Sequence, residues 1–153
     1  MRREYPDAPI AGVGAVIVAE DTGGGQKVLL IRRGQEPLKG EWSLPGGAVE
    51  LGETLEEAIQ REVLEETGLV VEAVEVVEAF DRITRDDSGR VRYHYVLVDF
   101  LCRVSGGAEL TRLVACATDA LEGRWAGPAE LDGLSPFTVK VIEKAWRIAA
   151  NDI

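Results

Sequence analysis

The chain has 153 residues, of which 46% are hydrophobic and 29% charged, and its formal net charge is −10. This length corresponds to a single domain, residues 1–153, that is large enough to bury a core without disulfide bonds. The negative balance argues against nucleic acids and anionic membranes as partners, because both attract basic surfaces, whereas phosphates remain accessible to an acidic protein through bridging divalent cations.

Two cysteines and one histidine restrict the chemistry further. Cys102 and Cys116 are too few for a disulfide framework, so we expect a reducing, cytoplasmic compartment. A single histidine, His94, excludes a histidine-rich zinc site. The N-terminal segment lacks the apolar run of a signal peptide, and no stretch approaches the ~18 apolar residues of a membrane span.

The first third of the chain predicts a β-hairpin followed by a loop. Residues 10–19 are rich in β-branched side chains and predict a strand, and residues 27–33 predict its partner. The glycines within residues 21–25 are typical of a hairpin turn. They do not form a phosphate-binding loop, because neither a Gly-Lys-Ser/Thr ending nor a helix follows them. Residues 34–45 are expected to be a loop.

Residues 54–68 predict the clearest helix in the chain. Thr54 and Glu57 have the spacing of a capping box, and Gly68 is typical of a helix C-terminus. An apolar stripe along this helix indicates that one face packs on the body of the protein.

The second half of the chain predicts a long hairpin and a final helix. Residues 70–82 and 91–104 predict two strands joined by a turn at residues 86–90. Residues 121–125 favour a short strand. A Ser-Pro pair then opens a C-terminal helix over residues 135–150.

Three glutamates of the first helix, Glu62, Glu65 and Glu66, fall on the same side as its apolar stripe. Carboxylates that face the body of a protein repel one another and lose solvation, and Arg61 is the cation beside them. A hard divalent cation would supply the missing positive charge, and oxygen ligands favour Mg²⁺ or Mn²⁺ over Zn²⁺. The Leu-Pro-Gly-Gly run at residues 44–47 allows close backbone approach to a ligand. The residues therefore predict metal-assisted phosphoryl chemistry.

Residues 47–69, GAVELGETLEEAIQREVLEETGL, resemble the Nudix box, with every defining position filled. The order of the expected elements on both sides is similar to that family as well. The resemblance implies an α/β (α+β) protein with the Nudix fold, a mixed, curved β-sheet sandwiched between α-helices. It also implies Mg²⁺-dependent hydrolysis, with Mn²⁺ as a substitute, of a pyrophosphate bond in a nucleoside diphosphate linked to another group. The substrate would be a small-molecule nucleotide, and a homodimer is compatible with the resemblance.

The resemblance assigns roles to individual residues. The metal ligands would be a backbone carbonyl and three carboxylates, from Gly46, Glu62, Glu65 and Glu66. The catalytic set would be Glu53, Arg61, Glu62 and Glu65, in which Arg61 orients the glutamates and Glu53 holds Arg61 from the far side. The general base is Glu62 by position in some members and an acid on a later loop in others, for which Asp119 and Glu122 are candidates. The sequence leaves these options open.

Substrate choice depends on residues outside the box. The stretch RRGQEPLKGEWSLPGG, residues 32–47, resembles bacterial ADP-ribose pyrophosphatases and favours ADP-ribose or a related nucleotide sugar, cleaved to AMP and ribose 5-phosphate. Those enzymes often carry a proline beyond the box, where this chain has Arg85. Two alternatives therefore stay open: a nucleoside-triphosphate pyrophosphatase that releases a monophosphate and pyrophosphate, and a non-catalytic domain that senses nucleotides.

Aromatic and charged side chains outside the box are candidates for substrate contact. The aromatic candidates, which would stack on a base or else pack in the core, are Phe80, Tyr93 and Tyr95. The basic candidates, which would contact phosphate or ribose or else be plain surface charge, are Arg32, Arg33 and Arg82. The acids Asp119 and Glu122 complete this set.

Overall fold

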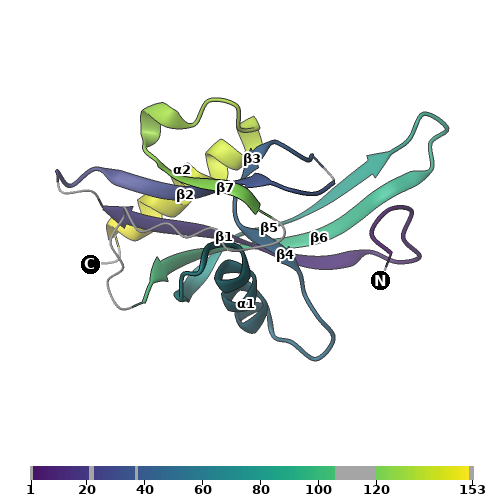
Figure 1. Cartoon of the computed structure of the whole chain (residues 1–153), viewed down its shortest axis with the longest axis horizontal. Helices are drawn as coiled ribbons and strands as arrows, with labels where there is room; N and C mark the ends of the chain where they lie inside the picture. The colour runs from purple at the N-terminus through teal and green to yellow at the C-terminus, as the bar shows by residue number, and fades with distance from the viewer. Residues whose placement is uncertain (1, 21–22, 37, 106–119, 152–153) are drawn as a thin grey trace.

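The computed structural model describes residues 2–20, 23–36, 38–105 and 120–151, with the backbone alone at 120 and 121. Figure 1 shows the strands in the middle of the molecule, with the helices on the outside. In chain order the elements are β1 (Ile10–Glu20), β2 (Gln26–Arg33), β3 (Trp42–Ser43), β4 (Gly46–Ala48), α1 (Leu55–Thr67), β5 (Val71–Arg85), β6 (Val91–Val104), β7 (Ala120–Ala126), a 3-10 turn (Pro128–Glu130) and α2 (Pro136–Asn151).

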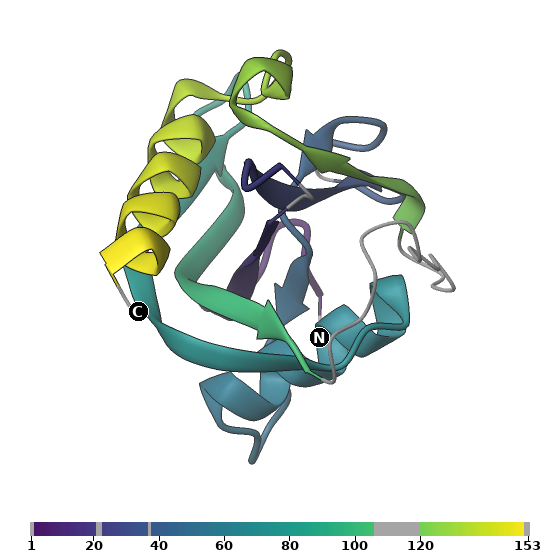
Figure 2. The same ribbon diagram turned by 90° about the vertical axis from the view of Figure 1, so that its left-hand side faces the viewer.

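The strands form one curved, mixed sheet, which the end-on view in Figure 2 shows wrapping around the centre of the molecule. The main path runs β3-β2-β1-β6-β5, while β4 also pairs with β1 and β7 with β2. Strands β1 and β6 are parallel, and the other pairs are antiparallel. The expectation of a mixed, curved sheet is confirmed.

The two helices cover opposite faces of this sheet. Val16 and Val18 of β1 belong to the core cluster that includes α2, whereas Ala15 and Ile17 belong to the cluster that includes α1. A strand that is covered on both faces reads as a continuous apolar run rather than an alternating one, which explains the sequence of β1. This arrangement confirms the predicted sheet between helices.

Helix α1 begins and ends where its sequence predicts. The Thr54 hydroxyl accepts from the Glu57 backbone N–H at 3.0 Å, and the Glu57 carboxylate accepts from the Thr54 N–H at 2.9 Å. Gly68 adopts the left-handed conformation with φ 76°, and its N–H donates to the Leu64 carbonyl. Both ends are therefore fixed by local chemistry, which sets the rotation of the helix and the direction of its glutamates.

Two short strands lie where the sequence predicted loop or left the structure open. β3 falls inside the expected loop at 34–45, and β4 follows directly after it. Their pairing partners are distant in sequence, since Ser43 lies opposite Ile31 and Gly47 opposite Val13. Strands of two or three residues carry too little periodicity to be recognised locally. Among the described residues, no helix combines the length and apolar character that crossing a membrane requires.

Candidate active site

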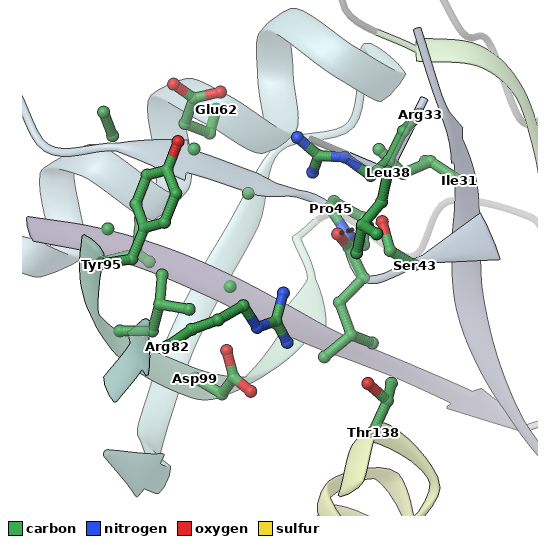
Figure 3. A pocket seen from close by; sticks show the side chains of 18 of the residues that line it. Ile31, Arg33, Leu38, Ser43, Pro45, Glu62, Arg82, Tyr95, Asp99 and Thr138 are labelled. Carbon is green, nitrogen blue, oxygen red and sulfur yellow. Dashed lines mark hydrogen bonds between the residues drawn. The ribbon is translucent and has the colours of Figure 1, made fainter. Parts of the chain in front are cut away.

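A cavity opens beside β1 and is lined by residues from β2, β4, α1, β5, β6 and α2 (Figure 3). Glu62 of α1 borders it at one end and Thr138 of α2 at the other, and Glu66, one turn after Glu62 on α1, also lines it. Gly12 and Gly14 of β1 form part of its wall. The curved sheet thus brings together side chains that are widely separated along the chain.

At the α1 end of the cavity, two carboxylates pack against the backbone of the Pro-Gly-Gly segment. Glu62 and Glu66 are only 6% and 2% exposed. The Gly46 N–H donates to Glu66 Oε1 at 3.4 Å. A Cβ added at Gly47 would lie 2.5 Å from the Glu62 carboxylate. A side chain at Gly47 would therefore displace the Glu62 carboxylate from its position in the cavity.

Arg61 holds the acidic groups in a fixed arrangement. Its Nε and Nη2 donate to both Glu53 oxygens, at 2.6 and 3.0 Å, in a bidentate pair. Nη2 also donates to the Ala48 carbonyl at 3.0 Å. Nη1 donates to Glu62 at 2.9 Å and to Glu65 at 3.3 Å. The geometry expected for Glu53 on the far side of Arg61 is present, whereas its catalytic role stays a prediction.

Glu65 does not share the burial of its neighbours. The sequence placed it on the inward side, but its side chain is 55% exposed, so that expectation is wrong. Its position lies at the border of the apolar stripe, where a side chain can reach solvent and still bind Arg61. Within the part of the chain that the structure describes, no three acidic, histidine or cysteine side chains converge as a metal cluster.

Burial and pairing shift the acidity of these groups in opposite directions. Burial raises the pKa of Glu62, against the opposing effect of Arg61 and a hydrogen bond with Glu66. The Arg61 guanidinium lowers the pKa of Glu53 to about 2, and Glu53 in turn raises the pKa of Arg61. Glu53 and Arg61 therefore form an ion pair at neutral pH. The pKa of Glu62 instead depends on the balance between burial, which raises it, and Arg61, which lowers it.

The donor set at this end fits a hard divalent cation. Two buried carboxylates, Glu62 and Glu66, lie beside the backbone of Gly46 and offer oxygen ligands alone. A cation bound here would relieve the repulsion between the two neighbouring carboxylates.

The candidate substrate residues separate into two groups. Those that line the cavity are Arg33, Phe80, Arg82 and Tyr95. Tyr93 is instead buried and stacks on Tyr95, with ring centroids 6.5 Å apart. Arg32 and Glu122 bind each other at 2.9 Å and do not line the cavity. Asp119, the other candidate base, lies outside the described residues.

With this geometry established, comparison with known proteins gives a clear family. The sequence model described as NUDIX domain matches residues 9–145. The chain belongs to this family. The resemblance in the box at residues 47–69 is thereby confirmed.

Three relatives indicate the range of the family around this chain. An ADP-ribose pyrophosphatase from Methanocaldococcus jannaschii is 43% identical over 81 residues, which cover 53% of this chain and 46% of that protein. An 8-oxo-dGDP phosphatase from Homo sapiens is 35% identical over 123 residues, which cover 78% of this chain and 35% of that protein. The crystal structure of a MutT NUDIX hydrolase from Burkholderia pseudomallei matches with a TM-score of 0.71 and 28% identity, covering 90% of this chain and 98% of that one. The match thus spans less than half the length of the first two relatives.

Several residues that line the cavity were missed by sequence reasoning, among them Arg3, Asp99, Phe137 and Thr138. Asp99 is 6% exposed, and burial raises its pKa to about 6, a shift that Glu78 reinforces and Arg82 opposes. The position of this acid within the apolar run VLVDFL of β6 could have marked it as a functional candidate. A buried charge lowers the stability of the fold unless a partner or ligand compensates it. Arg3, Phe137 and Thr138 carried no comparable signal.

Proposed function

We propose that this chain is a Mg²⁺-dependent hydrolase that cleaves the pyrophosphate bond of ADP-ribose or a related nucleotide sugar. The observation that carries this proposal is the buried pair of Glu62 and Glu66 beside Gly46, at one end of a cavity. Such a pair is stable when positive charge is added to it, and an anionic diphosphate binds where a cation bridges it to the protein. Mn²⁺ would serve as a substitute for Mg²⁺.

The residues around this pair would have separate roles in hydrolysis. When bound, the cation supplies positive charge that offsets both the glutamates and the diphosphate oxygens. Glu62 is our candidate for the general base, because it borders the cavity and its pKa is raised, so it accepts a proton from water more readily. Arg61 fixes the direction of the Glu62 carboxylate through its 2.9 Å hydrogen bond. Glu122 is a weaker candidate, because it is exposed and already paired with Arg32.

The basic side chains of the cavity support an anionic substrate. Arg3, Arg33 and Arg82 line it although the chain as a whole carries a net charge of −10. Guanidinium groups bind phosphate oxygens through paired hydrogen bonds. The preference for ADP-ribose rests on the archaeal relative, an ADP-ribose pyrophosphatase at 43% identity.

A second candidate is hydrolysis of an oxidised or ordinary nucleoside di- or triphosphate. The human relative, an 8-oxo-dGDP phosphatase, favours this alternative. The same carboxylates would act in both reactions, so the two candidates differ in substrate and products rather than in the chemical step. A non-catalytic sensor is the least favoured, because the carboxylates of the box are all present.

The test is incubation of the purified protein with Mg²⁺ and a panel of ADP-ribose, ADP-glucose, 8-oxo-dGDP and nucleoside triphosphates. Products are identified by chromatography, with EDTA as the control. Release of AMP and ribose 5-phosphate, fastest from ADP-ribose, would support the proposal. Faster release of phosphate from 8-oxo-dGDP, or of pyrophosphate from triphosphates, would move the assignment to the second candidate. No turnover of any member would contradict both.

Removal of the Glu62 charge tests the site itself. Glu62→Gln keeps the volume of the side chain, and we expect kcat to fall about 10²- to 10⁴-fold while the fold persists. Glu56→Gln is the matched control, because Glu56 is exposed on the same helix and should leave kcat within about 2-fold of wild type. Equal losses in the two variants would contradict a specific role for Glu62.

A further inference from the structure

Asp99 is a buried acid inside the cavity that the proposed reaction does not use. It lies in the middle of β6, is 6% exposed and points into the cavity, as Figure 3 shows. Its carboxylate leans over β1 and occupies the space that a Cβ at Gly14 would need. Gly14 therefore leaves room for this carboxylate.

The surroundings of Asp99 leave its charge poorly compensated. The charged groups that act on it are Arg82, which lies beside it in Figure 3 and attracts it, and Glu78, which repels it; both belong to the neighbouring strand β5. None of the hydrogen bonds among the described residues involves the Asp99 carboxylate. An ionised carboxylate is only a hydrogen-bond acceptor, and a buried one without donors is costly. Hydroxyl or amino donors of a ligand in the cavity would therefore stabilise the ionised carboxylate of Asp99.

The position of Asp99 indicates which part of a nucleotide would supply those donors. A phosphate is excluded by its own negative charge. In the sheet, Asp99 lies opposite Gly14, which in turn lies opposite Gly46. Two strand spacings of about 4.8 Å separate the backbones of Asp99 and Gly46 by about 10 Å, and the Asp99 side chain leans back over Gly14. A carboxylate at this distance is within reach of the sugar next to a phosphate held at Gly46.

Ribose has the complementary chemistry. Its two neighbouring hydroxyl groups are donors that a single carboxylate accepts together, as acidic residues do with ribose in dinucleotide sites. We propose that Asp99 is a specificity-determining residue that accepts hydrogen bonds from the hydroxyl groups of a ribose next to the diphosphate. This inference rests on the proposed function, and it narrows the substrates to ribonucleotides over their deoxy analogues.

The experiment compares substrates that differ by a single group. The kcat/KM of ADP-ribose is measured against analogues that lack the 2′-hydroxyl of either ribose, and against inosine diphosphate ribose, which lacks the amino group of the base. We expect the wild-type enzyme to prefer ADP-ribose over at least one deoxy analogue by about 100-fold or more, because a site built to bind a hydroxyl rejects ligands without it.

Three variants assign that preference to Asp99. Asp99→Ala should reduce the preference to less than about 5-fold, by lowering kcat/KM for ADP-ribose rather than for the deoxy analogue. Gly14→Ala should do the same while keeping the acid, because its Cβ displaces the Asp99 carboxylate. Asp81→Asn is the matched control, since Asp81 is exposed on β5 and outside the cavity, and it should keep the full preference.

Each outcome decides the question. An unchanged preference in Asp99→Ala would overturn the inference while leaving the proposed function intact. Lost discrimination against the inosine substrate alone would also overturn it, because the donor would then be the base. If the wild type cleaves no nucleotide sugar, the proposed function fails. The same variants are then compared on ATP and dATP. Equal rates for ATP and dATP in the wild type would overturn the inference as well.

Discussion

Arg61 joins Glu53, in the loop before α1, to the carboxylates on the helix. Its planar guanidinium places two N–H groups on Glu53 and a third on Glu62, an arrangement that a lysine could not reproduce. Glu53 is not among the residues that line the cavity, and its side-chain hydrogen bonds go to Arg61 and the Glu50 backbone. Any influence it has on the reaction must therefore pass through Arg61, which makes it a positioning residue.

Replacement of Glu53 by glutamine tests this positioning role. The variant loses the charged half of the bidentate pair, so we expect kcat to fall about 10- to 100-fold with a smaller change in KM. Glu50→Gln is the matched control, because Glu50 approaches Arg61 at 3.7 Å but is 68% exposed and should change kcat less than about 2-fold. Steady-state kinetics with Mg²⁺ measures both, and indistinguishable variants would refute the role of Glu53.

Asp99 makes a second prediction at the residue scale, this time for stability. Burial raises its pKa from the ordinary 3.8 to about 6, so the folded state binds this proton more tightly than the unfolded state does. Its ionisation therefore costs stability as the pH rises from about 4 to about 6. A shift of about two pKa units corresponds to about 3 kcal/mol.

Asp99→Asn should remove that cost. Relative to wild type, the variant should gain up to about 3 kcal/mol in the free energy of unfolding at pH 7.5, and much less at pH 4. Denaturant unfolding at both pH values, without metal or substrate, measures the difference. A stability difference between variant and wild type that does not change with pH would contradict the raised pKa.

At the scale of elements, the capping box of α1 should be measurable as a unit. Thr54→Ala removes the hydroxyl that accepts from the Glu57 N–H, and we expect the free energy of unfolding to fall by about 1 kcal/mol. The Thr54→Ala/Glu57→Ala pair should lose less than the sum of the single losses, because the two bonds close one motif. Thermal melts of the four proteins test this, and strict additivity would argue against a coupled box.

The elements that sequence predicted well are those fixed by local chemistry. Thr54, Glu57 and Gly68 specify both ends of α1 by themselves, so the helix and two of its buried glutamates could be predicted. β3 and β4 could not, since they exist only because β2 and β1 lie beside them. The acid at Asp99 stands out in the sequence, but its role could not be predicted, because the space for its carboxylate is left by Gly14 of another strand.

At the scale of the whole molecule, the fold buries neighbouring negative charges that a bound cation would neutralise. The chain carries a net charge of −10, and two of its acids, Glu62 and Glu66, are buried next to each other at the end of the cavity. The stability of the protein should therefore depend on divalent cations more strongly than on ionic strength, because exposed charges are screened by any salt and buried ones are not.

Melting curves of wild type and Glu66→Gln separate these effects. In EDTA the variant should melt higher than wild type, because one source of repulsion between buried carboxylates is gone. In Mg²⁺ at about 100 times its Kd, wild type should gain about 2.7 kcal/mol and overtake the variant, which has lost a ligand. KCl at matched ionic strength is the control and should not reverse the order. If the variant were already less stable than wild type in EDTA, Glu66 would be a structural acid rather than part of a metal site.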